Sequence, residues 1–249
     1  MSEQKHPDLA RREFLSSGAK LTVAGVTLAS GVTLYTAAQA KPAEEAVTSK
    51  VRWGLLIDTT KCSNGCNACV SACNEWNGLE SKGRPTTDAQ WIRKVELKNK
   101  STGMSHSLPV MCQHCEKPPC VDVCPTGASM KRADGIVLVD RHICIGCRYC
   151  MMACPYKARS FVHEDLENQR PHQPRGKGCV EACNLCVSRV DGGQLPACVE
   201  KCSAEGHNAM IFGDLNDPTS AIAQAVKQYP TRQIREDLDL NPGVRYQGI

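Results

Sequence analysis

Cysteine dominates what this chain can fold into. The chain has 249 residues and 17 cysteines, and 16 of these fall into four groups of four. The groups are Cys62, Cys66, Cys69 and Cys73; Cys112, Cys115, Cys120 and Cys124; Cys144, Cys147, Cys150 and Cys154; and Cys183, Cys186, Cys198 and Cys202. Only 4% of the residues are aromatic. Whatever binds these thiols must therefore supply part of the interior, so that binding and folding are coupled.

The spacing inside the groups is typical of iron–sulfur ligation. In the bacterial ferredoxin run C-x2-C-x2-C-x3-C-P, the fourth cysteine ligates the other cluster of a pair. Residues 144–155, CIGCRYCMMACP, match this run at every position, and residues 112–125, CQHCEKPPCVDVCP, match it with a longer middle gap. Pro125 and Pro155 end the local helical turn after the fourth cysteine. The sequence therefore predicts [4Fe–4S] clusters.

Three other interpretations of the cysteines stay open. A disulfide scaffold suits an exported protein, but repeated C-x2-C pairs have poor disulfide geometry and the count of 17 is odd. Zinc binds C-x2-C knuckles tetrahedrally, although the x3-C-P endings fit zinc poorly. The third is a mixture, in which one site holds a [3Fe–4S] cluster or none.

The first 40 residues predict a targeting signal. Residues 11–15, RREFL, form a twin-arginine pattern, residues 21–38 are mildly apolar, and residues 38–40, AQA, offer a cleavage site. A retained membrane anchor is the alternative, although the stretch is short and carries several Thr and Ser. The twin-arginine route exports folded proteins, which suits a protein that acquires clusters in the reducing cytoplasm. We therefore expect a periplasmic chain that is soluble or peripheral to the membrane after residue 40.

Composition excludes one further class of partner. The formal net charge of +4 is small for this length, and no basic block is interleaved with aromatic residues. We therefore expect no binding to nucleic acid.

We expect an α+β fold of two pseudo-symmetric, bacterial-ferredoxin-like modules with loop insertions and a cluster-rich core. Alternation and turn residues predict strands at 51–57, 91–97, 136–139 and 209–213, a turn at 132–135, a helix at 219–228 and an extended tail after Pro230. Residues 74–90 and 164–178 are interpreted as surface segments. The predicted parts are a signal (1–40), a linker (41–50), an outer half (51–103 and 164–215), a central half (104–163), and a C-terminal helix and tail (216–249).

The motif order resembles a known family. Residues 112–128, CQHCEKPPCVDVCPTGA, residues 140–156, DRHICIGCRYCMMACPY, and residues 183–202, CNLCVSRVDGGQLPACVEKC, are similar to its signatures. The family comprises the four-cluster ferredoxin-like electron-transfer subunits of membrane-bound oxidoreductases, such as polysulfide, tetrathionate and dimethyl-sulfoxide reductases. The resemblance covers about residues 51–215. Within the family, this chain carries a signal of its own and lacks a C-terminal membrane helix. That combination is most similar to the DsrO type, from the sulfite-reduction-associated complex DsrMKJOP.

The resemblance implies a crossed and nested ligation, with four cluster sites that we number in order. Site 1 would comprise Cys62, Cys66, Cys69 and Cys202; site 2, Cys73, Cys183, Cys186 and Cys198; site 3, Cys112, Cys115, Cys120 and Cys154; and site 4, Cys124, Cys144, Cys147 and Cys150. The first run departs from the family pattern by one extra residue in its first gap. Cys179 is surplus: it could be a spare buried thiol, a ligand in place of Cys183, or a redox or partner-contact thiol.

The resemblance also implies electron transfer. The chain would relay electrons between a polytopic, quinone-interacting membrane subunit of the polysulfide-reductase type and a periplasmic multihaem cytochrome c, in sulfur metabolism. It carries no GxGxxG fingerprint or P-loop, so we expect no substrate chemistry of its own. The alternative is the iron–sulfur subunit of a molybdopterin oxidoreductase of the tetrathionate or polysulfide type. A different class is a zinc- or disulfide-stabilised structural protein without a redox role.

Some residues near the runs have two interpretations each. His114 could tune a cluster by a hydrogen bond or could simply pack. The methionines at 151–152 are expected to pack beside a cluster. Lys157, Arg159 and the basic segment 170–177 could face an acidic partner or only solvent.

Overall fold

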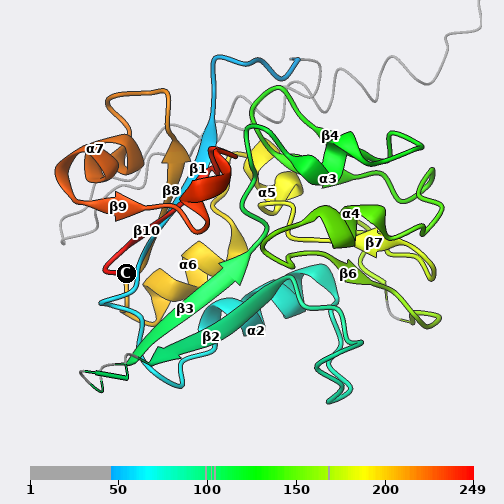
Figure 1. The fold of residues 1–249 in the computed structure, drawn as a ribbon, viewed down its shortest axis with the longest axis horizontal. Coiled ribbons are helices and arrows are strands. Elements are labelled where there is room, and N and C mark those ends of the chain that lie inside the picture. Colours follow the sequence, from blue (N-terminus) through cyan, green and yellow to red (C-terminus); the bar gives the residue numbers. More distant parts are fainter. Residues whose placement is uncertain (1–45, 99, 102, 104, 168) are drawn as a thin grey trace, which may run out of the picture. The chain divides into compact units, whose positions relative to one another are not determined.

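The computed structural model describes residues 46–98, 100–101, 103, 105–167 and 169–249. The predicted signal and the first half of the predicted linker lie outside these residues. The elements, labelled in Figure 1, are β1 (Trp53–Asp58), α2 (Ala68–Asn77), β2 (Ile92–Lys98), β3 (Ser105–Met111), α3 (Pro119–Asp122), β4 (Ser129–Lys131), β5 (Val137–Val139), α4 (Tyr149–Ala153), β6 (Ser160–Phe161), β7 (Val180–Glu181), α5 (Val187–Asp191), α6 (Ala197–Ala204), β8 (Met210–Asp214), α7 (Ala221–Gln228), β9 (Thr231–Arg232), the 3-10 helix η1 (Glu236–Leu238) and β10 (Val244–Gln247). The mixture of helices and strands expected of an α+β fold is confirmed.

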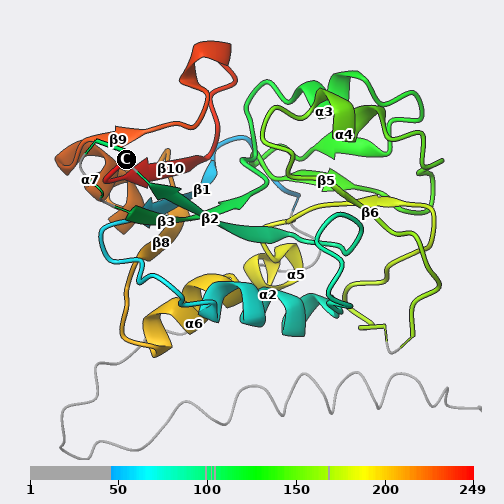
Figure 2. The same cartoon turned by 60° about the horizontal axis from the view of Figure 1, so that its bottom comes forward.

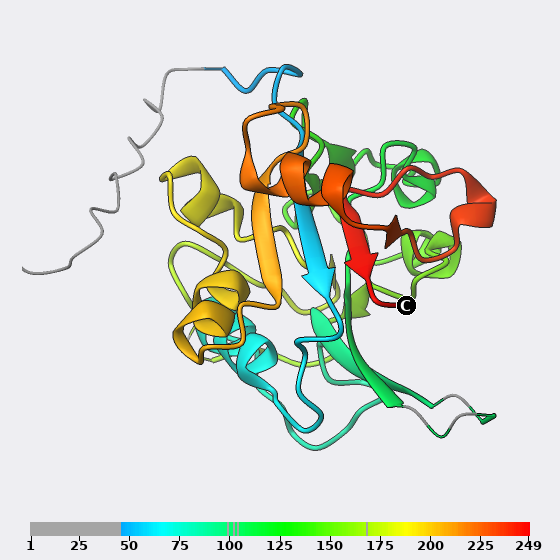
Figure 3. The same cartoon turned by 90° about the vertical axis from the view of Figure 1, so that its left-hand side faces the viewer.

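A four-stranded sheet in the order β8-β1-β10-β9 supports the structure, and Figure 3 shows its three longer strands side by side. Strand β1 lies inside this sheet and is apolar because both of its faces are covered. Successive side chains alternate between the faces. Leu55 and Ile57 therefore pack into the cysteine-rich core, whereas Leu56 packs against Ile222 of α7.

The C-terminal tail closes this sheet. The predicted extended tail is confirmed as β10, which runs parallel to β1 with Leu55 opposite Val244. Tyr246 of β10 is fully buried, and its hydroxyl donates to the Pro109 carbonyl (3.0 Å) and accepts from Gln113 Nε2 (3.1 Å). The tail therefore anchors the segment that leads into the second cysteine run.

The hairpin of β2 and β3 leads to the same run. The predicted strand at 91–97 is confirmed as β2, which pairs antiparallel with β3 from Ile92–Met111 to Lys98–Ser105. Strand β3 was not predicted, and it contains Pro109, which lacks the N–H group that a central strand needs. The sheet accommodates Pro109 because it has only two strands, β2 and β3, so that one edge of β3 pairs with no further strand. Strand β3 ends at Met111, directly before Cys112.

The cysteine runs lie on short helices that pack in two pairs. Helix α2 of the first run packs against α6 of the fourth, and α3 of the second run packs against α4 of the third (Figure 2). Helix α2 extends to Asn77 and ends at Gly78 in the left-handed conformation (φ 65°). Residues 74–77 therefore belong to this helix, and the prediction that they form part of a surface insertion is wrong. Pseudo-symmetry between the two halves stays a prediction.

The predicted turn at 132–135, the strand at 209–213 and the helix at 219–228 agree with the structure, whereas the predicted surface segment 164–178 contains the buried Gln173 and Arg175. Strands β4 and β5 form the hairpin expected around residues 132–135, where Arg132 N–H donates to the Ile136 carbonyl at 2.8 Å. Strand β8 and helix α7 occupy the positions expected for a strand and a helix. Ser220 caps α7 by accepting a hydrogen bond from Ala223 N–H at 3.2 Å, as its residue type favours.

The buried tyrosine provides a test of how strongly the tail holds the fold. Tyr246→Phe should destabilise the protein by about 1–3 kcal/mol, because it removes the hydroxyl's hydrogen bond to the Pro109 carbonyl and one of the two hydrogen bonds of Gln113 Nε2, which keeps its bond to the Met111 carbonyl. The check is the midpoint of thermal unfolding, measured anaerobically. Tyr229→Phe is the matched control, since Tyr229 is 44% exposed. Equal midpoints for the two variants would contradict a structural role for the Tyr246 hydroxyl.

Candidate functional site

All 17 cysteines have free thiols, and most of them are buried. Cys62, Cys66, Cys124, Cys144 and Cys179 are partly exposed, and Cys147 is exposed. Thiols in such numbers are unusual in an interior that lacks disulfides. Their grouping in space decides what they can bind.

Site 1 combines thiols from the two ends of the cysteine-bearing region. Burial raises the pKa of the Cys69 thiol to about 11, the Lys94 ammonium group opposes this, and the neighbouring thiolates of Cys62, Cys202 and Cys66 add to it. Lys94 Nζ donates to Cys62 Sγ at 3.3 Å and to the Cys66 carbonyl at 2.7 Å. Cys202 of the fourth run therefore lies with the thiols of the first run.

Site 2 is the most deeply buried. Burial raises the pKa of Cys183 and of Cys198 well above the usual range, and neighbouring thiolates of the same site raise both further. For Cys183 these neighbours are Cys73, Cys198 and Cys186. Asn77, at the end of α2, places its Nδ2 3.5 Å from Cys73 Sγ. Cys73 thus lies among thiols of the fourth run.

Site 3 shows the expected crossing most directly. One cavity is lined by all four of its thiols: those of Cys112, Cys115, Cys120 and Cys154. Burial raises the pKa of Cys115 to about 12, and the thiolates of Cys120 and Cys154 add to this effect. Ala158 N–H donates to Cys154 Sγ at 3.5 Å. Cys154 follows α4 of the third run, yet its thiol lies with the thiols of the second run.

Site 4 is the most open. Burial raises the pKa of the Cys150 thiol, and among the neighbouring groups the Cys144 thiolate adds to this. Burial also opposes ionisation of Cys124, but hydrogen bonds, first from Ser129 N–H (3.3 Å to Sγ), lower its pKa overall. Cys124 follows α3 and Cys147 precedes α4, two helices that pack together.

The loops of the runs have an unusual backbone. Four residues within the runs have left-handed φ angles although they are not glycine: His114 (45°), Arg148 (64°), Leu185 (51°) and Cys186 (49°). Such angles cost free energy and persist where the surroundings enforce them. Left-handed turns of this kind aim successive N–H groups into a concavity that suits an anion. The successive left-handed residues Leu185 and Cys186 are therefore consistent with a loop that wraps a negatively charged group.

The residues of these sites fit [4Fe–4S] clusters. Each site is predicted to offer four thiols, and N–H groups of Ser129 and Ala158 donate to sulfur as they do around iron–sulfur centres. Among the described residues, no three His, Cys, Asp or Glu side chains converge closely enough to hold a single metal ion. A cubane cluster places iron and sulfide between its thiolates, so they stand further apart than ligands of one tetrahedral ion.

His114 packs in the interior and does not face solvent. Its Nδ1 accepts a hydrogen bond from Val137 N–H at 3.0 Å. Burial, with the nearby Arg159 and Arg52, lowers its pKa to about 3, so the imidazole is neutral. Of the two methionines, Met151 packs against the core, whereas Met152 is 75% exposed.

The surplus Cys179 lies beside site 4. Its thiol donates to the Arg141 carbonyl at 3.4 Å and neighbours the Cys144 thiol. Gly146 (φ 68°) allows this approach, because a Cβ there would lie 2.2 Å from the Gly178 carbonyl oxygen. Cys183, in contrast, lies among the thiols of site 2. The geometry favours Cys183 over Cys179 as the ligand.

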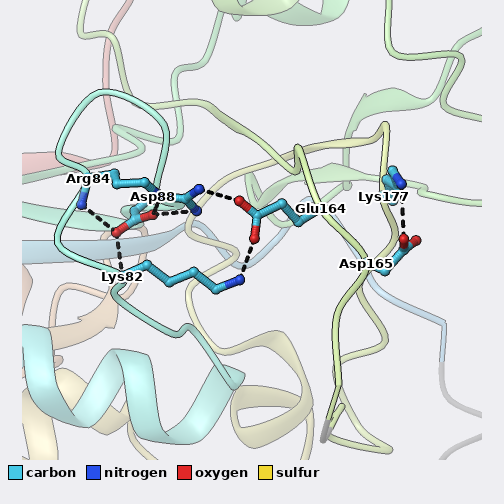
Figure 4. A network of polar contacts seen from close by, with 6 residues as sticks. All are labelled: Lys82, Arg84, Asp88, Glu164, Asp165 and Lys177. Atoms are coloured by element: carbon cyan, nitrogen blue, oxygen red, sulfur yellow. Dashed lines mark hydrogen bonds and ion pairs between the residues drawn. The ribbon is translucent and has the colours of Figure 1, made fainter.

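The basic side chains that could face a partner divide between surface and interior. Lys157 is exposed, but Arg159 is only 6% exposed, so the prediction that it faces a partner or solvent is wrong. Arg175 is also buried and forms an ion pair with Glu181 (2.6 Å). On the surface, Lys177 pairs with Asp165 at 3.0 Å (Figure 4). Much of the charge of this segment is therefore already compensated.

A second surface network joins the segment after α2 to the segment after β6. Glu164 accepts from both Lys82 and Arg84, and Asp88 accepts from Arg84 Nε at 3.1 Å (Figure 4). The ion pairs lower the pKa of Glu164 to about 2. This network fastens two loops and holds no cysteine, so it supports the fold rather than the sites.

Comparison with known protein families gives two matches, both described as a 4Fe–4S dicluster domain. One covers residues 104–215 and the other residues 61–128. Together they include all four cysteine runs. The sites built from the geometry therefore coincide with regions matched by iron–sulfur domains.

Individual relatives match over much of the chain. The Hdr-like menaquinol oxidoreductase iron-sulfur subunit 1 of Archaeoglobus fulgidus is 37% identical over 96% of this chain and 97% of its own length. A subunit of the tetrathionate reductase of Salmonella typhimurium is 35% identical over 97% of this chain and 89% of its own length. A subunit of the sulfite dehydrogenase of Allochromatium vinosum is 37% identical over 77% of this chain and 81% of its own length.

The crossed arrangement predicts which signal a ligand mutation removes. Cys154→Ser should perturb the cluster bound by the second run, because Cys154 lies in its cavity. The check is electron paramagnetic resonance of the reduced, anaerobically purified protein, together with its iron content. Loss of the cluster bound by Cys144, Cys147 and Cys150 instead would contradict the crossing.

Cys179→Ser is the matched control. It removes one thiol beside site 4 without removing any of the sixteen predicted ligands. All cluster signals and the iron content should match those of the unmodified protein. A missing signal would make Cys179 a ligand.

Proposed function

This chain belongs to the family of ferredoxin-like iron–sulfur subunits of membrane-associated oxidoreductase complexes, and from that membership we propose that it binds four [4Fe–4S] clusters and relays electrons through them. Each bound cluster accepts and returns one electron. The protein holds the clusters at fixed separations and sets their potentials through burial, charge and hydrogen bonds to sulfur.

The observation that carries this proposal is the order of neighbouring thiols. Cys69 of site 1 neighbours Cys198 of site 2. Cys183 of site 2 neighbours Cys112 of site 3. Cys120 of site 3 neighbours Cys150 of site 4. The four sites thus form a continuous series from 1 to 4, as an electron relay requires.

Exposure along the series supports exchange at its ends. Thiols of sites 2 and 3 are buried, whereas Cys62 and Cys66 of site 1 are partly exposed and Cys147 of site 4 is exposed. Three large apolar side chains close to Cys147 in the sequence are exposed, Ile145 by 67%, Tyr149 by 57% and Met152 by 75%, beside the exposed Arg148. Exposed large apolar side chains that gather in one place are typical of contact surfaces. Electrons would enter or leave where a partner covers this region.

The partners we propose are a polytopic, quinone-interacting membrane subunit and a periplasmic multihaem cytochrome c. The similarity to a menaquinol oxidoreductase subunit supports a quinone-linked role. The described residues contain no helix that is long and apolar enough to cross a membrane. We propose a periplasmic location, from the twin-arginine pattern at residues 11–15, and a DsrO-type role in sulfur metabolism.

The second candidate is the iron–sulfur subunit of a molybdopterin oxidoreductase. It is favoured by the similarity to the tetrathionate reductase subunit, which extends over 97% of this chain. The relay would be the same in both cases, since the sites and their order do not change. Only the partner at one end would differ.

Metal analysis tests the cluster content. Protein purified without oxygen should contain roughly sixteen iron and sixteen sulfide per chain, from about four of each in every [4Fe–4S] cluster. Its visible absorption should be broad and should bleach on reduction. Zinc without sulfide would sink the proposal, and about twelve iron would leave three clusters.

A pull-down in mild detergent, from membranes that contain the native complex, tests the partners. The eluate should contain covalent haem, a polytopic membrane subunit and no molybdenum. Molybdenum without haem would replace the first candidate with the second. The control for non-specific co-purification is a membrane protein of equal abundance that does not bind this complex, solubilised in the same detergent.

A further inference from the structure

Arg159 is a buried cation without a carboxylate partner among the described residues. It precedes β6, is 6% exposed, and lines the cavity of site 3. The other buried guanidinium of this region, Arg175, forms an ion pair with Glu181. An isolated buried charge costs several kcal/mol, so it is tolerated only where something compensates it.

The groups around Arg159 are thiols and a hydroxyl. Its Nη2 donates to Cys120 Sγ at 3.0 Å and to Ser129 Oγ at 2.8 Å. Burial lowers the pKa of Arg159, and the thiolates of Cys120, Cys112 and Cys150 raise it by more than burial lowers it. Its Nε and Nη1 are buried without a hydrogen-bond partner among the described residues. The side chain thus has unused donors in a cavity lined by thiols.

The hydrogen bonds of Arg159 reach two cluster sites. Its direct partner Cys120 belongs to site 3, and Cys150, whose thiolate acts on Arg159 electrostatically, belongs to site 4. Ser129, which accepts from Arg159, donates its backbone N–H to Cys124 Sγ of site 4 at 3.3 Å. One guanidinium is therefore joined to a ligand of site 3 directly and to a ligand of site 4 through a single serine.

Clusters bound in both sites would supply the counter-charge of Arg159. A [4Fe–4S] cluster with four thiolates carries net negative charge, which increases by one when the cluster is reduced. A cation beside it stabilises the reduced form more than the oxidised form and so raises the reduction potential. A cation between two clusters also lowers the repulsion between them when both are reduced.

We propose that Arg159 is the shared counter-charge of sites 3 and 4, which raises the potentials of both clusters and allows both to be reduced together. This inference rests on the proposed function, because it requires clusters in these sites. Arg159 acts through the clusters and is a positioning residue. Its position at the junction of two sites distinguishes it from Lys94, which contacts only the first run.

The test is a redox titration followed by electron paramagnetic resonance on the anaerobically purified protein. Arg159→Met removes the charge at similar length, and Arg159→Lys keeps the charge but loses the planar fork. We expect the potentials of clusters 3 and 4 both to fall in Arg159→Met, and to fall less in Arg159→Lys. The potentials of clusters 1 and 2 serve as the internal standard and should not move. Lys157→Met, which removes an exposed charge two residues away, should leave all four unchanged.

The other possible outcomes test the inference and the proposed function separately. Unchanged potentials in Arg159→Met, with the iron content retained, would overturn the inference while leaving the relay intact. A fall at only one of the two clusters would overturn the shared role. If Arg159→Met loses cluster 3, the potential of cluster 4 is measured in the same sample. A lowered potential of cluster 4 would support the inference, and an unchanged potential would overturn it. Absence of clusters from the unmodified protein, seen first by iron analysis, would overturn the proposed function and the inference together.

Discussion

Burial of thiolate is the interaction on which the rest of this structure depends. Burial raises the pKa of most of these thiols, so the protein interior on its own favours neutral sulfur. Iron binds thiolate, and its positive charge offsets the cost of taking that thiolate out of water. With so few aromatic side chains, the clusters must also fill the interior. Ligand binding and folding are therefore one process in this chain.

The predicted crossed ligation agrees with how the chain returns on itself. Helices α2 and α6 come from opposite ends of the cysteine-bearing region and pack together, while α3 and α4 do so within it. Strands β1 and β10 hold the outer segments in place, since Leu55 pairs with Val244 across most of the chain. In the proposed ligation, each site then takes at least one thiol from another run. Loss of one cluster should therefore loosen two separated parts of the sequence.

Charge is distributed unevenly along the series of sites. Lys94 donates to sulfur at site 1, and Arg159 does so at site 3, where it is buried. At site 4, Cys124 receives a backbone hydrogen bond from Ser129, and Cys147 is exposed. Charge, hydrogen bonds and solvent exposure each act on the potential of a nearby cluster. The chain thus has separate means of setting each step of an electron relay.

By itself, the sequence determined the ligand type, the four runs and the elements with strong local signals. The spacing of Cys144, Cys147 and Cys150 predicts three ligands of one cluster, because they are close enough in the chain to converge. Local sequence pattern predicted β1, β2 and β8, with alternation as the signal for β2, whereas no strand was predicted at β3, which contains Pro109. The run itself predicts that Cys154, its fourth cysteine, ligates the other cluster of a pair, but the identity of that cluster came only from the family resemblance. Only the tertiary structure placed Arg159 in the interior and Cys179 beside site 4, since burial and long-range contacts depend on segments far apart in the sequence.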